Sequence, residues 1–98
     1  MTPKRILVAD DDPFILELYQ TALEGHNYEI ETATDGREAL RAATTKPYDL
    51  VIMDIVMPNM NGIDSIRAIR KKHPALPIII ISTQESLRLA QSRMGLRI

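Results

Sequence analysis

The sequence predicts a three-layer α/β fold, in which a doubly wound parallel sheet carries helices on both faces. Short apolar runs alternate along the chain with longer segments whose apolar residues recur at helical spacing. Asp, Asn, Gly and Pro residues stand between the two kinds of segment, as they do at the ends of helices and strands. Strands that alternate with helices in this way pair in parallel, because each return to the sheet uses a helix as its crossover.

The first strand and helix are predicted from the segment before Gly25. Residues 6–9 form an apolar run bounded by charge, which is typical of a strand buried on both faces. Asp12 and Pro13 favour the N-cap and first position of a helix, and Gly25 is placed to end it. The apolar residues that recur at helical spacing are Phe14, Ile15, Leu18, Tyr19, Ala22 and Leu23.

The second strand is predicted over residues 28–33, where glutamates alternate with less polar residues. One face of this strand is therefore expected to be more exposed to solvent than the other. Asp35 and Gly36 then begin a helix that continues to about Thr45. The inner face of this helix is formed by Ala39, Leu40 and Ala43.

Residues 50–53 predict a third strand that delivers Asp54 at its end. A loop containing Pro58 and Gly62 then leads into a helix with inward-facing isoleucines and an exposed basic side. The isoleucines are Ile63, Ile66 and Ile69, and the basic residues are Arg67, Arg70, Lys71 and Lys72.

The four consecutive isoleucines at 78–81 predict a fourth, buried strand. A weaker helix is predicted over residues 85–94, with Gly95 as its cap. A chain of 98 residues that is 45% hydrophobic suits one domain, which we expect to span residues 1–98.

Aspartates follow two of the predicted strands. Asp10, Asp11 and Asp12 stand at the carboxyl end of the first strand, and Asp54 stands at the carboxyl end of the third. Ligands of open parallel sheets bind at this edge, and neighbouring strands lie roughly 4.8 Å apart, so we expect these carboxylates to converge. Like charges this close raise one another's pKa unless a cation intervenes. A set of oxygen ligands without His or Cys suits Mg²⁺.

A simpler interpretation exists for each aspartate taken alone. Asp12 precedes Pro13 and is expected to cap the first helix. For Asp10 and Asp11 by themselves, capping or a solvated loop is as good an account as metal binding. The second strand end with its own aspartate, Asp54, favours the metal site.

Three segments together resemble the receiver domains of two-component response regulators. They are residues 6–13 (ILVADDDP), 54–62 (DIVMPNMNG) and 77–82 (PIIIIS). The Asp-x-x-Met-Pro-x-Met-x-Gly pattern, combined with the upstream aspartate pair, is highly specific, and the similarity runs from about Lys4 to Gly95. The resemblance implies a flavodoxin-like (CheY-like) sheet with strand order 2-1-3-4.

The resemblance also implies the role of each acidic residue. Asp54 would accept a phosphoryl group, Asp11 would ligate Mg²⁺ directly, and Asp10 would hold it mainly through water. Val56 would contribute its backbone carbonyl to the metal. The donor would be a sensor histidine kinase, a phosphotransfer protein or a small phosphodonor, and such domains are signalling proteins rather than enzymes.

Hydroxyl and amide residues after the fourth strand complete the implied site. Ser82 falls on the Ser/Thr switch position of the family, where its hydroxyl would contact the phosphoryl group. Thr83 competes for this role because a one-residue shift exchanges the two, and an ordinary strand-end serine is the structural alternative. Val56 and Gln84 would modulate the access of water. Since an apolar Val56 cannot orient water, we expect slow dephosphorylation.

The C-terminal segment departs from the family pattern. Receiver domains normally continue into a fifth strand with a lysine and an aromatic switch residue, and then a fifth helix. No lysine follows Lys72, and the guanidinium of Arg97 differs in geometry from an ammonium. We therefore expect a C-terminally incomplete receiver domain, with residues 78–81 as an edge prone to self-association or domain swapping. The functional alternative is a phosphorylation-silent, receiver-like interaction module.

Other classes of protein lack support. A phosphatase of the haloacid dehalogenase type needs an acid two residues after its nucleophile, where Val56 stands. A net charge of −1 and a basic stretch without aromatic residues argue against direct nucleic-acid binding. The chain has no cysteine, and His26 and His73 lack the spacing of metal ligands. With no signal peptide or membrane-spanning run, we expect a cytoplasmic protein without a membrane partner.

Overall fold

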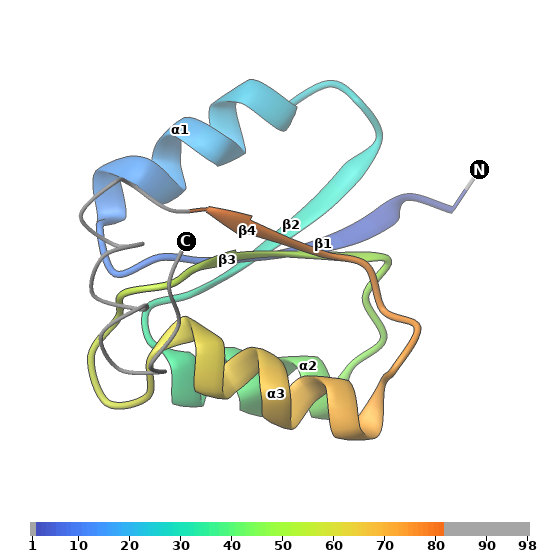
Figure 1. Cartoon of the computed structure of the whole chain (residues 1–98). Coiled ribbons are helices and arrows are strands. Elements are labelled where there is room, and N and C mark those ends of the chain that lie inside the picture. The colour runs from blue at the N-terminus through green and yellow to red at the C-terminus, as the bar shows by residue number, and fades with distance from the viewer. Residues whose placement is uncertain (1, 82–98) are drawn as a thin grey trace.

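The computed structural model describes residues 2–81, which form a four-stranded parallel sheet between two layers of helices (Figure 1). The order of the strands is β2-β1-β3-β4, as expected from the family resemblance. The strands are β1 (Lys4–Ala9), β2 (Tyr28–Ala33), β3 (Leu50–Asp54) and β4 (Ile78–Ile81). Helix α1 (Pro13–Leu23) covers one face of the sheet, and α2 (Gly36–Thr45) and α3 (Gly62–Lys72) cover the other (Figure 1).

Side-chain caps fix where each helix begins. Asp12 accepts a hydrogen bond from the backbone N–H of Phe14 at 2.9 Å, and Pro13 follows at the first helical position, so the predicted start of α1 is confirmed. Asp35 caps α2 by accepting from the backbone N–H of Glu38 at 2.7 Å. Asn61 caps α3 in the same way, so each helix starts directly after a loop at the carboxyl edge of the sheet.

Apolar side chains form one core on each face of the sheet. The larger core lies under α2 and α3, and its fully buried members include Leu7, Ala9, Val51, Met53, Ala39, Ala43 and Ile69. The smaller core lies under α1 and consists of Ile6, Val8, Leu16 and Ile52. The apolar residues 6–9 of β1 and 51–53 of β3 are therefore buried on both faces of the sheet.

The predicted apolar face of α1 is confirmed at Tyr19 and Leu23, which pack against the smaller core, and is wrong at Phe14 and Leu18. Phe14 is 64% exposed and Leu18 is 49% exposed, whereas Leu16, which is not among the residues predicted for that face, is 7% exposed. Leu16, Tyr19 and Leu23 are the residues that α1 packs onto the sheet. Leu16 also lies at helical spacing from Tyr19 and Leu23, so periodicity alone does not decide which apolar residues face the core.

Two predictions for the second half of the chain also need correction. Arg70 is only partly exposed on α3, because its guanidinium donates to the backbone carbonyls of Pro74 and Leu76. Strand β4 is not buried: Ile79 and Ile80 are about half exposed. Among residues 2–81, β4 pairs with β3 alone and forms an edge of the sheet. This agrees with the prediction that residues 78–81 form an edge strand.

Several predicted features fall outside residues 2–81. They are Ser82, Thr83, Gln84, the helix at 85–94, Gly95 and Arg97. Among the described helices, none is both long and apolar enough to cross a membrane.

Candidate functional site

The register of the sheet places the aspartates of two strands together. Strand β1 pairs with β3 from Ile6 opposite Leu50 to Ala9 opposite Met53, so Asp10 emerges beside Asp54. One carboxylate oxygen from each of Asp10, Asp11 and Asp54 lies within 4.8 Å of the other two. These three residues are called the acidic cluster below, and their predicted convergence is confirmed.

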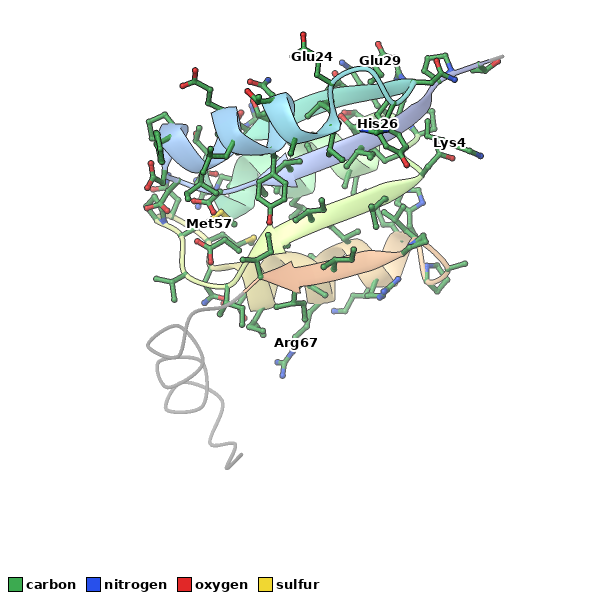
Figure 2. The ribbon with its side chains drawn as sticks, turned by 90° about the horizontal axis from the view of Figure 1, so that it is seen from above. Lys4, Glu24, His26, Glu29, Met57 and Arg67 are labelled. Atoms are coloured by element: carbon green, nitrogen blue, oxygen red, sulfur yellow. The ribbon has the colours of Figure 1, made fainter. Side chains whose placement is uncertain are left out.

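The acidic cluster lies at one end of the molecule only. In Figure 2, Met57 marks this carboxyl end of the sheet, and Lys4 and His26 lie at the opposite end. His26 is therefore remote from the cluster, and its ring lies 6.4 Å from that of Tyr28.

Asp10 is the buried member of the cluster, with 7% of its surface exposed. Its carboxylate accepts a hydrogen bond from the backbone N–H of Asp12 at 2.9 Å, and its own N–H donates to the carbonyl of Ala33 at 3.0 Å. Burial raises the pKa of Asp10, and the charges of Asp11 and Asp12 raise it further against the opposing hydrogen bond. The side chain is thus held in place while its charge stays poorly compensated.

Asp54 ends β3 and is half-buried. Burial raises its pKa most, and the charge of Asp10 comes second, partly offset by backbone hydrogen bonding from Val56. Two neighbouring carboxylates with raised pKa values mark a place where negative charge accumulates without a matching cation.

The residues present fit a small divalent cation. Within the described part of the chain, no ion pair involves a member of the acidic cluster. The ligand atoms are carboxylate oxygens, which hard cations such as Mg²⁺ prefer, and Asp11 is exposed, so one side of the cluster is open to solvent. A bound cation would lower the pKa of Asp10 and of Asp54, because its positive charge stabilises both carboxylates.

The loop after Asp54 is shaped by close backbone packing. The N–H of Gly62 donates to the carbonyl of Ile55 at 2.7 Å, which closes the loop at its base. A Cβ at Gly62 would lie 2.0 Å from the carbonyl oxygen of Asp54, so no larger residue fits there. Val56, near the start of this loop, is 39% exposed. The metal-binding role of its carbonyl remains a prediction, as do the roles of Ser82, Thr83 and Gln84.

Sequence reasoning missed one residue beside the cluster. Tyr19 of α1 packs against the smaller core, and its pKa is raised by burial first and then by the charges of Asp10 and Asp54. The ionisation of the Tyr19 phenol is therefore affected by the negative charge of the acidic cluster. The helical spacing of α1 does include Tyr19, but only the packing of α1 on the sheet reveals which carboxylates it approaches.

The model of the response regulator receiver domain family matches residues 6–97. The chain belongs to this family. Among curated relatives, it is 33% identical to the probable transcriptional regulatory protein TcrX of Mycobacterium tuberculosis over 85 residues, which cover 87% of this chain and 36% of TcrX. It is 37% identical to the alkaline phosphatase synthesis transcriptional regulatory protein PhoP of Bacillus subtilis, covering 84% of this chain and 34% of PhoP. The receiver domain thus spans about a third of these relatives.

Solved structures of receiver proteins have the same fold. The response regulator TrrA of Thermotoga maritima, in complex with Mg²⁺ and BeF, is 42% identical and superposes with a TM-score of 0.81. That comparison covers 95% of this chain and 81% of TrrA. The chemotaxis response regulator CheY4 of Vibrio cholerae is 33% identical, with a TM-score of 0.80 and coverage of 97% and 82%. The fold of this chain therefore agrees with the fold of solved receiver proteins.

Proposed function

We propose that Asp54 is the phosphoacceptor of this receiver domain, with Mg²⁺ held by Asp10, Asp11, Asp54 and the backbone carbonyl of Val56. The observation that supports this proposal most directly is the convergence of three carboxylates within 4.8 Å. Asp54 is the member that combines partial exposure with a place at the end of a central strand. TrrA, which is similar in sequence and fold, binds Mg²⁺ and BeF.

The residues of this chain account for phosphoryl transfer in two halves. An oxygen of the Asp54 carboxylate attacks the phosphorus of a phosphohistidine, a P–O bond forms, and the imidazole nitrogen leaves with the electrons of the broken P–N bond. When bound, Mg²⁺ supplies positive charge against the phosphoryl oxygens. Water later attacks the acyl phosphate, which releases inorganic phosphate and restores the carboxylate.

The other assigned roles follow the same proposal. Ser82, or Thr83 in the competing register, donates its hydroxyl to a phosphoryl oxygen. Val56 and Gln84 would modulate the access of the hydrolytic water. The partner is a sensor histidine kinase or a phosphotransfer protein, and the domain acts as a signalling switch whose only chemical turnover is on its own acyl phosphate.

The exposed edge strand supports a proposal about self-association. Ile79 and Ile80 are about half exposed on β4, which carries no charged side chain. We propose that this apolar edge, as it stands among residues 2–81, pairs with a second copy of the chain or exchanges segments with it. Analytical ultracentrifugation over a range of concentrations tests this, and a monomer at every concentration would refute it.

The experiment that tests phosphoryl acceptance is intact-mass spectrometry. The protein is incubated with Mg²⁺ and a small acyl phosphate, beside an Asp54→Ala variant and a sample in which a chelator has removed the metal. We expect a phosphoryl adduct only in the wild-type protein with Mg²⁺. A folded wild-type protein that forms no adduct would instead indicate the silent interaction module.

A further inference from the structure

The loop that follows Asp54 contains a backbone turn of unusual conformation. Asn59 has a φ of +65°, a region that residues other than glycine rarely adopt. The backbone N–H of Met60 donates to the carbonyl of Pro58 at 2.7 Å, so the chain reverses over three residues with Asn59 at the centre. A strained turn of this kind persists only where surrounding contacts hold it.

The contact that holds the turn comes from the start of α2. The side-chain amide of Asn59 donates to one carboxylate oxygen of Asp35 at 2.7 Å. The other oxygen of Asp35 accepts the N-cap hydrogen bond from the backbone of Glu38, also at 2.7 Å. One carboxylate therefore caps a helix and binds the acceptor loop at the same time.

Close packing beside this hydrogen bond joins the same segments a second time. A Cβ at Gly36 would lie 1.8 Å from the carbonyl oxygen of Met60, so the first turn of α2 presses directly on the loop backbone. The buried hydroxyl of Ser65 donates to the carbonyl of Gly36 at 2.8 Å, which adds α3 to the junction. The far part of the loop thus has fixed neighbours on both sides.

The position of this turn bears on the acidic cluster. The loop begins at Asp54, passes through Val56 and is closed at its base by the hydrogen bond between Gly62 and Ile55. With the base closed and Met57 buried in the larger core, the far part of the loop is attached to α2 by the hydrogen bond of Asn59 and by the packing of Met60 on Gly36. Loss of the hydrogen bond between Asn59 and Asp35 would remove one of these attachments from the loop that follows Asp54.

We propose that Asp35 and Asn59 are positioning residues, whose hydrogen bond holds the acceptor loop in its Mg²⁺-binding geometry and couples the N-terminus of α2 to the acidic cluster. This inference rests on the proposed function, because it concerns the same metal site. Neither residue belongs to the acidic cluster. Each acts through the loop backbone.

Two single variants and their combination separate positioning from folding. Asn59→Gly keeps the positive φ available and removes the amide, and Asp35→Ser keeps a helix cap with a side chain too short to reach Asn59. The readout is the affinity for Mg²⁺ alone, measured by calorimetric titration, beside the melting temperature without metal. We expect each single variant to weaken Mg²⁺ binding about tenfold, and the double variant to weaken it no further.

Asn27→Gly provides the matched control. Asn27 also has a positive φ, of 59°, but it lies before β2, at the opposite end of the sheet from the cluster. This control relieves the same kind of backbone strain and is expected to leave Mg²⁺ affinity unchanged. Single variants within about twofold of the wild-type affinity, or losses that simply add in the double variant, would overturn the inference.

The same titration distinguishes this inference from the proposed function. If the wild-type protein binds Mg²⁺ and forms the Asp54 adduct while both variants bind equally well, the positioning role alone is refuted. If the wild-type protein binds no Mg²⁺ at all, the proposed function and the positioning role are refuted together.

Discussion

The carboxylates of Asp10 and Asp54 have oxygens within 4.8 Å of each other, although the two residues belong to different strand ends. The charge of Asp10 raises the pKa of Asp54, and only burial has a larger effect. The unfolded chain separates these charges and hydrates them. Without a cation, the repulsion between these two carboxylates therefore lowers the free energy of unfolding. The protein is destabilised at the site where the proposed function needs negative charge.

Asp54→Asn is accordingly expected to stabilise the metal-free protein at neutral pH. Because the pKa of Asp54 is raised in the folded state, the wild-type protein loses stability as pH rises from the ordinary carboxyl range through the raised value. The variant has no such loss, and its free energy of unfolding should be higher by on the order of 1 kcal/mol, the scale of charge interactions that water still reaches. Urea denaturation with a chelator measures this difference.

Asp64→Asn removes the same charge from a residue outside the acidic cluster and is the control. Asp64 lies in the first turn of α3, where a negative charge is favourable, so this variant should gain no stability. With Mg²⁺ present, the wild-type protein should gain stability and Asp54→Asn should gain less. An Asp54→Asn variant less stable than wild type without metal would contradict the argument.

Gly36→Ala is expected to destabilise the fold by about 3 kcal/mol, because the new Cβ would meet the backbone carbonyl of Met60 at 1.8 Å. A backbone atom cannot move aside as the end of a side chain can. Gly25→Ala is the comparison: no atom lies near its Cβ, but a φ of +82° makes alanine unfavourable by about 1 kcal/mol. Thermal unfolding of both variants checks the ranking, and equal losses would mean that the loop yields to the methyl group.

The acidic cluster was predictable because it depends on local rules. Aspartates that directly follow the apolar runs of β1 and β3 must meet at the carboxyl edge of a parallel sheet, whatever the details of packing. The caps at Asp12 and Asp35 were predictable for a similar reason, since residue type and position within a few residues determine them.

The features that escaped prediction depend on contacts between distant segments. Helical periodicity on α1 is compatible with Leu16 as well as with Phe14 and Leu18, and only packing on the sheet selects Leu16. The hydrogen bond between Asp35 and Asn59 joins a helix cap to a loop that follows the next strand. Neither residue type nor spacing indicates that partnership, because it exists only once α2 and α3 pack side by side.

Tyr48 is expected to make stability fall at alkaline pH. Burial, followed by the carboxylate of Glu31, raises the pKa of Tyr48 to about 12 in the folded protein. The unfolded chain releases this proton near pH 10, so between about pH 10 and about pH 12 deprotonation favours the unfolded state. Tyr48→Phe should therefore lose less stability between about pH 9 and about pH 11 in urea denaturation.

Tyr19 explains why Tyr48→Phe should retain part of this decline, since its pKa is raised as well. The free energy of unfolding of the double variant Tyr19→Phe/Tyr48→Phe should change still less with pH over the same range. Identical pH dependence in wild type and Tyr48→Phe would show that the Tyr48 hydroxyl titrates normally in the folded protein.

Val56 sets the expected lifetime of the phosphorylated state. Its side chain is 39% exposed two residues after Asp54, and an isopropyl group can neither accept a proton from water nor hold water in line with phosphorus. Val56→Asn should therefore shorten the lifetime of the acyl phosphate by about tenfold, less than a fully positioned general base contributes. Val56→Ala, which opens space without adding a polar group, separates access from orientation. Loss of the phosphoryl adduct is followed by intact mass after the donor is removed, and an asparagine variant that loses phosphate no faster than wild type would remove Val56 from the mechanism.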